Sequence, residues 1–153
     1  MAGTSSAGLL LYRIRHAAIE VLLVHPGGPY WKTKDDGAWS IPKGEFSGAE
    51  YPLVAARREF FEETGVAIEG DLRALKPIQQ SGGKIVHAWA VEGDLDPTTI
   101  VSNTFDIEWP PRSGRLQSFP EIDRAAWFAL PEATRKILRG QMPLLEELAQ
   151  MLV

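Results

Sequence analysis

The feature that most constrains this chain is a glutamate-rich segment that lies between a proline and a glycine. From Pro52 to Thr64, apolar residues recur at helical spacing among charged ones, which predicts a helix with one buried stripe. Gly65 is expected to end this helix, because glycine readily adopts the left-handed backbone of a C-terminal cap. Glu59, Glu62 and Glu63 fall within one helical turn, inside an arc of about 100°. A fold that contains this helix must therefore present three carboxylates on one face.

Carboxylates gathered in this way favour a bound cation. Without one, they repel one another and destabilise the helix by roughly a few tenths of a kcal/mol per pair. Mg²⁺ matches best, because it prefers carboxylate oxygens, keeps several waters and bridges to substrate phosphates. Mn²⁺ is expected to substitute for it. The alternative is that these glutamates are simply solvated, as most surface glutamates are.

The spacing of the surrounding residues favours the metal site. The pattern consists of Gly44, Glu50, Arg58, Glu59, Glu62, Glu63, Gly65 and Val66 at their spacings. A chance match to all of these positions in a chain of this composition is on the order of one in a million. Residues 44–66 resemble the Nudix box, the motif of the Nudix hydrolases. Phe60 stands where an aliphatic residue is more usual, and Gly48 is one residue early, but neither change removes a ligand.

The resemblance implies a set of metal ligands. Glu59 and Glu63 correspond to the first ligands, and Glu62 to a further or water-mediated one. The carbonyl group of Gly44 is expected to complete the site. A calcium-buffering protein is a poor alternative, because such sites enclose the ion with about six to eight oxygens and leave no room for substrate.

Three further residues have expected roles around the metal. Arg58 precedes Glu62 by four residues, so the two can pair along the helix and hold the carboxylate in one rotamer; an ordinary surface arginine is the alternative. Glu50 is expected to fix the loop and the helix start. Glu121 is the candidate general base, because residues 119–133 resemble the usual end of the family: a loop glutamate, a Trp-Phe strand and a helix. The family also takes its base from the box, and Glu121 is otherwise a solvated loop residue.

Several residues are candidates for substrate binding. Residues 39–44 resemble the corresponding segment of Nudix enzymes that act on dinucleoside polyphosphates or inositol pyrophosphates, and Lys43 is expected either to contact a phosphate or to face solvent. Arg112 and Arg115 share a loop that is interpreted as a phosphate clamp or as plain surface. The chain lacks a tyrosine in residues 81–87, where the dinucleoside subgroup often has one, so the subgroup stays open. Tryptophans 31, 89 and 109 can stack a base, although tryptophan near a strand is usually core.

The order of elements predicts an α/β fold, and the resemblance implies a Nudix-type α/β/α sandwich with a mixed β-sheet. A length of 153 residues fits a single domain, 1–153. The C-terminal helix is expected to pack on the sheet or to form a dimer contact, so monomer and homodimer both stay open. Expected strands cover 9–14, 19–24, 39–42, 72–80, 85–91, 104–109 and 127–129, and expected further helices cover 132–138 and 144–152.

Composition limits the expected cellular location and partners of the protein. The chain has no cysteine, which excludes thiolate metal sites and a cysteine nucleophile and fits the reducing cytoplasm. The formal charge of −4 argues against a partner that is a nucleic-acid polymer. No apolar run approaches the roughly 20 residues of a membrane-spanning helix, and no basic region precedes the first apolar stretch, so neither membrane insertion nor export is expected.

These observations predict a Mg²⁺-dependent pyrophosphohydrolase. Its substrate is expected to be a small molecule with a phosphoanhydride in a nucleoside diphosphate linked to another moiety, such as a dinucleoside polyphosphate or a nucleoside triphosphate. The alternative is a nucleotide-sensing module that keeps the fold without catalysis. The intact glutamates at 59, 62 and 63 favour the enzyme, because these positions serve no obvious packing need.

Overall fold

A central strand, β1 (Ser5–Arg15), organises the computed structural model, which describes residues 4–152. β1 runs parallel to β6 (Ile85–Glu92) on one side and antiparallel to β2 (Ala18–Pro26) on the other. β9 (Ile122–Ala129) extends the sheet beyond β2, and β3 (Lys43–Glu45) pairs with the first half of β1. The short strands β4 (Arg73–Ala74) and β5 (Ile78–Gln79) pair with β6. The mixed sheet that the sequence predicts is confirmed.

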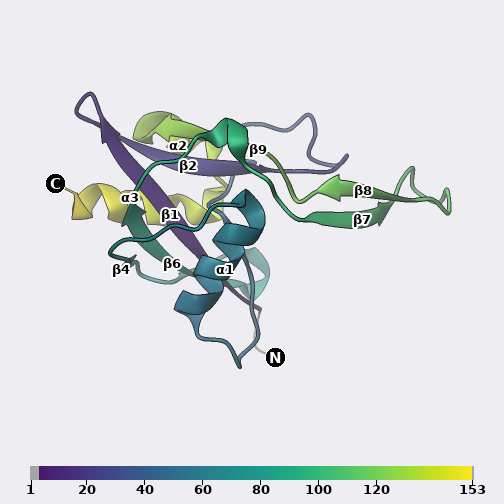
Figure 1. Cartoon of the computed structure of the whole chain (residues 1–153), viewed down its shortest axis with the longest axis horizontal. Coiled ribbons are helices and arrows are strands. Elements are labelled where there is room, and N and C mark those ends of the chain that lie inside the picture. The colour runs from purple at the N-terminus through teal and green to yellow at the C-terminus, as the bar shows by residue number, and fades with distance from the viewer. Residues whose placement is uncertain (1–3, 153) are drawn as a thin grey trace.

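Both faces of this sheet are covered by helices (Figure 1). Leu10 and Tyr12 point toward the core beneath α2 (Leu130–Lys136) and α3 (Met142–Met151). Leu9 and Leu11 point toward the opposite core, which packs against α1 (Pro52–Thr64). A strand buried on both faces reads as a continuous apolar run, which explains the unbroken Leu9-Leu10-Leu11. The α/β/α sandwich is confirmed.

The helix α1 has the bounds that the sequence predicts, Pro52 to Thr64. Ala55, Ala56 and Phe60 are fully buried on its inner face. Gly65 ends the helix at φ 77°, and its N–H donates to the Phe61 carbonyl at 2.7 Å. Phe60, one of the two unusual residues of the motif, is therefore the main apolar anchor of the helix. No helix within residues 4–152 is long and apolar enough to cross a membrane.

Other parts of the chain differ from the expectation. Residues 39–42 form only isolated bridges, at Trp39 and Ser40, and the strand begins at Lys43. Gly44, the first residue of the motif, therefore lies in a strand. The expected strand 72–80 is split into β4 and β5, and β9 begins at Ile122 rather than at Trp127.

A hairpin outside the main sheet is the largest difference. β7 (Thr104–Glu108) pairs with β8 (Leu116–Pro120), and the two strands project from the body of the molecule (Figure 1). The sequence did not predict β8, because its five residues end in proline and include no β-branched side chain. The turn between the strands is the loop that contains Arg112 and Arg115.

The different burial of two adjacent phenylalanines gives a test of the packing of α1. Phe60 is fully buried, whereas the Phe61 side chain is 54% exposed. We expect Phe60→Ala to lower the free energy of unfolding by about 3–5 kcal/mol, through lost burial and the cavity left behind. Phe61→Ala, the matched control, is expected to change it by about 0.5 kcal/mol or less. Urea denaturation measures both, and equal losses would contradict this packing.

Candidate active site

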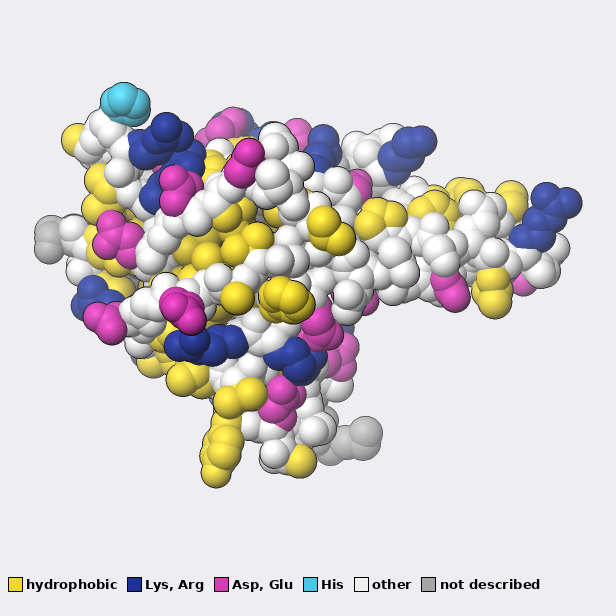
Figure 2. Space-filling view, viewed as in Figure 1, with side chains coloured by type: hydrophobic (Ala, Val, Ile, Leu, Met, Phe, Trp, Pro, Cys, Tyr) yellow, Lys and Arg dark blue, Asp and Glu magenta, His cyan; other side chains and the backbone are white. Residues whose placement is uncertain are grey.

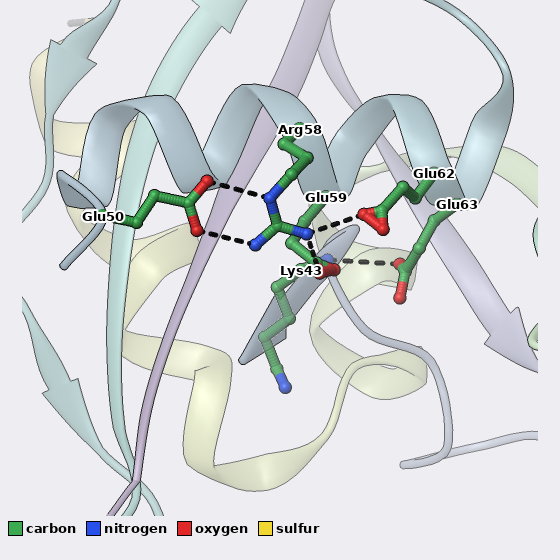
Figure 3. Close-up of polar contacts among 6 residues, drawn as sticks. All are labelled: Lys43, Glu50, Arg58, Glu59, Glu62 and Glu63. Carbon is green, nitrogen blue, oxygen red and sulfur yellow. Dashed lines mark hydrogen bonds and ion pairs between the residues drawn. The ribbon is translucent and has the colours of Figure 1, made fainter. Parts of the chain in front are cut away.

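The guanidinium group of Arg58 joins three carboxylates (Figure 3). Its Nε and Nη2 atoms each donate to Glu50 at 2.9 Å, in a paired arrangement. Its Nη1 atom donates to Glu59 at 2.9 Å and to Glu62 at 2.6 Å. These hydrogen bonds lower the pKa of Glu50 and raise that of Arg58. Because charge-assisted and bidentate bonds have strict geometry, Arg58 orients the glutamates on both sides of it.

β3 and α1 approach each other closely at Gly44. The carboxylate of Glu59 occupies the space that a Cβ atom at position 44 would need. Gly44 pairs with Ala7 of β1, so its backbone is held in the sheet. Glycine at this position therefore allows the helix carboxylate to rest against the strand backbone, and Glu59 and Gly44 are brought together.

Glu63 lies on the next part of the same helix face and contacts Lys43. The backbone N–H of Lys43 donates to Glu63 Oε1 at 3.2 Å. Burial raises the pKa of Glu63 to about 8, and repulsion from the Glu59 and Glu121 carboxylates adds to this effect. Burial also lowers the pKa of the Lys43 ammonium group. In Figure 3 this ammonium group points away from the glutamate oxygens, so Lys43 does not neutralise them by direct contact.

Glu121 comes from a distant part of the chain, between β8 and β9. It lines a cavity of about 230 Å³ together with Glu63 and Lys43. Burial raises its pKa, and repulsion from Glu62 raises it further. The fold therefore brings the glutamate that follows the hairpin to the glutamates of α1.

The donor set fits a divalent cation. Burial raises the pKa values of Glu59, Glu63 and Glu121, and repulsion from neighbouring glutamates raises each of them further. Figure 2 shows acidic side chains gathered beside α1, below the base of the hairpin. Within residues 4–152, however, no three acidic or histidine side chains already surround one point, while Arg58 binds Glu59 and Glu62. Mg²⁺ does not need such a cage, because it is usually held by one or two carboxylates, waters and substrate phosphates.

The two arginines of the expected clamp lie elsewhere. Arg112 and Arg115 are exposed at the turn of the β7–β8 hairpin, where Figure 2 shows basic side chains at the tip. The backbone N–H of Arg112 donates to Glu108 at 3.0 Å, a contact within the hairpin. Neither arginine lines the cavity beside Glu63.

Sequence reasoning gave little weight to the loop that walls this cavity. Trp31 lines it, together with apolar residues of β2 and of the chain around Ala38 and Leu138. Trp89, by contrast, packs against the core beneath α1. A signal was present in the sequence, because Tyr30 and Trp31 directly follow the turn residues 26–29 and large aromatic residues are uncommon in a plain turn.

The raised pKa of Glu63 predicts a pH-dependent stability. The folded pKa of about 8 exceeds the ordinary 4.5, so the folded protein keeps a proton that the unfolded chain has released. The stability of the metal-free protein is therefore expected to fall between about pH 4.5 and about pH 8. Glu63→Gln removes this ionisation and should raise the melting temperature more at about pH 8.5 than at about pH 5, measured with a chelator present.

The exposed Glu69 supplies the control for this experiment. Glu69→Gln is expected to change the melting temperature equally little at both pH values. Adding Mg²⁺ should stabilise the wild type more at the higher pH, because a proton competes with the metal for the carboxylate. A Glu63→Gln effect independent of pH would show that Glu63 is ionised normally in the folded protein.

Comparison with known structures supports the architecture. The Ap4A hydrolase of C. elegans, in a binary complex, is similar with a TM-score of 0.65 and 23% identity, over 97% of both chains. The NUDIX domain of Shewanella oneidensis NrtR, in complex with ADP ribose, has a TM-score of 0.69 and 15% identity, over 100% of this chain and 90% of that one. At these identities the likeness shows a shared fold.

Sequence comparison gives the family. An 8-oxo-(d)GTP phosphatase of Mycolicibacterium smegmatis is 39% identical over 101 residues, which span 62% of this chain and 28% of that relative. The chain thus matches only about a quarter of the relative's length. The family model described as NUDIX domain matches residues 4–148, almost the whole chain. Together with the glutamates of α1 and the α/β/α fold, this match shows that the chain belongs to the NUDIX domain family.

Proposed function

We propose that this protein is a Mg²⁺-dependent pyrophosphohydrolase that cleaves a phosphoanhydride in a nucleoside diphosphate linked to another moiety. The observation that carries this proposal is that Glu63 and Glu121 line one cavity, while repulsion from Glu59 and Glu62 contributes to the raised pKa values there. The pKa of Glu59 is raised as well. Titratable groups perturbed by burial and by one another are typical of functional sites.

The metal ligands in this proposal are Glu59 and Glu63, with Glu62 and the Gly44 carbonyl as further contacts. Mg²⁺, or Mn²⁺ in its place, supplies positive charge that offsets the negative phosphoanhydride oxygens. Arg58 acts as a positioning residue, because it binds Glu59 and Glu62 without needing to contact substrate. Lys43 lines the cavity and provides a positive charge for a phosphate oxygen.

Glu121 is the proposed general base. Its carboxylate takes a proton from a water molecule whose oxygen forms a bond to phosphorus, while the bond from that phosphorus to the bridging oxygen breaks. The products are two phosphate-bearing molecules, and no covalent intermediate with the protein is required. A raised pKa suits this role, because a general base is most effective when its pKa lies near the working pH.

The similar proteins support the proposed substrate class. Their names refer to 8-oxo-(d)GTP, Ap4A and ADP ribose, and each of these contains a nucleoside diphosphate. Nucleoside triphosphates and dinucleoside polyphosphates are therefore the proposed substrates, rather than a nucleic-acid polymer. The absence of cysteine is consistent with work in the reducing cytoplasm.

A nucleotide-sensing module is the second candidate. The NrtR domain, which is similar over the whole chain, is described in complex with ADP ribose, so this fold can bind a nucleotide. The two candidates differ in turnover. A sensor binds the nucleotide and leaves it unchanged, whereas the proposed enzyme releases phosphate-bearing products.

The proposed function is tested by product analysis with Mg²⁺ across nucleoside triphosphates, dinucleoside polyphosphates, nucleotide sugars, dinucleotide cofactors and inositol pyrophosphates. We expect the wild type to hydrolyse one nucleotide class and Glu63→Gln to lose that activity. Glu121→Gln is expected to lower kcat by about 10²- to 10⁴-fold with little change in KM, the usual contribution of a general base.

Glu69→Gln is again the control and should keep full activity. Metal-dependent nucleotide binding without turnover of any compound would favour the sensing module. Full activity of Glu121→Gln would remove this residue from the mechanism and direct attention to the glutamates of α1.

A further inference from the structure

The cavity beside the carboxylates continues into a second cavity. The first has a volume of about 230 Å³ and the second about 270 Å³, and both are lined by Pro26, Trp31 and Glu121. Each is smaller than the roughly 300 Å³ at the lower end of small-molecule sites. Because they share three lining residues, they can accept two parts of one molecule.

The two cavities differ in chemistry. The first contains Lys43 and Glu63 in addition to Glu121. The second is lined by the aromatic residues Tyr30, Trp31 and Phe105, and its charged residue is Glu121, which lines both cavities. Tyr30 is 56% exposed and Trp31 is 36% exposed, so their rings are accessible to a ligand.

We propose that this second cavity, formed by residues 26–31 and Phe105 of β7, is the subsite for the nucleobase of the substrate. The inference rests on the proposed function, which places the phosphoanhydride beside Glu63 and Glu121. A base has an apolar aromatic face that stacks on side chains such as Trp31. A nucleotide with its phosphates in the charged cavity meets an aromatic surface immediately beyond Glu121.

The loop that carries the aromatic residues is held tightly against the base of the hairpin. The backbone N–H of Gly27 donates to the Glu121 carbonyl at 2.8 Å, and a Cβ atom on Gly27 would overlap the Pro120 carbonyl. Gly28 adopts φ 97°, and a Cβ there would lie 2.9 Å from the ring of Phe105. The two glycines thus allow the loop to contact the hairpin closely, which preorganises the wall of the cavity.

Contacts on both sides of the loop add to this order. The ring of Tyr30 lies edge-on to Trp109 of the hairpin, with centroids 5.3 Å apart. The Lys34 ammonium group lies 5.3 Å from the centre of the Trp31 ring. Fully buried His25 contacts both ends of this region, with Nδ1 2.9 Å from Asp123 and Nε2 2.6 Å from the Lys34 carbonyl. These contacts fix the loop to β9, which begins next to Glu121.

The experiment compares the nucleotide that the wild type hydrolyses with the analogue that lacks the base, such as a nucleoside triphosphate with ribose 5-triphosphate. We expect Trp31→Ala to raise KM for the nucleotide about 5- to 150-fold, which corresponds to the roughly 1–3 kcal/mol of one base–aromatic stack. Its KM for the base-free analogue should stay that of the wild type. Trp31→Phe should restore most of the loss, because a phenyl ring still stacks.

Tyr51→Ala is the matched control. Tyr51 is an aromatic residue that is 80% exposed at the start of α1, and it lines neither cavity. Its substitution should leave both KM values unchanged. Thermal unfolding of each variant shows whether an increase in KM reflects misfolding. Phe105→Ala is a second test from the hairpin side, and it should likewise raise KM for the nucleotide but not for the base-free analogue.

The outcomes separate the two proposals. If the wild type hydrolyses the nucleotide, but Trp31→Ala and Phe105→Ala change KM equally for the nucleotide and for the base-free analogue, the base subsite is overturned. The proposed function would still stand. Absence of turnover by the wild type would overturn the proposed function. In that case, binding of a nucleoside monophosphate is measured by tryptophan fluorescence. A change in the fluorescence of the wild type that is lost in Trp31→Phe would support the base subsite. Unchanged fluorescence of the wild type would overturn it.

Discussion

Burial of β1 on both faces is the constraint on which the geometry of the site depends. The strand must be covered by α1 on one side and by α2 and α3 on the other. α1 packs through Phe60, which turns the charged face of the helix outward. β3 lies so close to β1 that a Cβ atom on Gly8 would meet the Pro42 carbonyl and Lys43. The sheet therefore places the backbone of Lys43 and Gly44 directly against the carboxylates of α1.

These close contacts create an electrostatic conflict in the folded protein. Burial and mutual repulsion disfavour the charged forms of Glu59, Glu63 and Glu121, and Arg58 offsets only part of the negative charge. A helix selected for stability alone would not keep this arrangement, because repulsive groups cost stability without improving packing. The conflict is resolved when positive charge enters the cavity, so the unfavourable electrostatics of the metal-free protein and the proposed affinity for a cation have the same origin.

The sequence predicted what local periodicity and a contiguous motif encode. The limits of α1, its Gly65 cap and the Arg58–Glu62 pair follow from spacing along one helix, and the structure confirms them. The apolar run of residues 9–14 predicted a strand for a similar reason, and the structure confirms it as part of β1. The role of Arg112 and Arg115 depended instead on the direction of a hairpin, and β8, which sets that direction, has too weak a strand pattern to be recognised. Tertiary placement of a loop is not encoded in local spacing.

Glu121 links the proposed chemistry of the site with the proposed recognition of the nucleobase. Its side chain lines both cavities, while its carbonyl accepts the hydrogen bond from Gly27 that anchors the aromatic loop. A displacement of this loop therefore moves the residue that is proposed to deprotonate water, and small errors in such positions have large effects on rate. Base stacking on Trp31 would thus favour the loop position in which Glu121 is correctly placed. In these two proposals, recognition of the nucleobase and alignment of Glu121 as the general base therefore depend on one set of contacts.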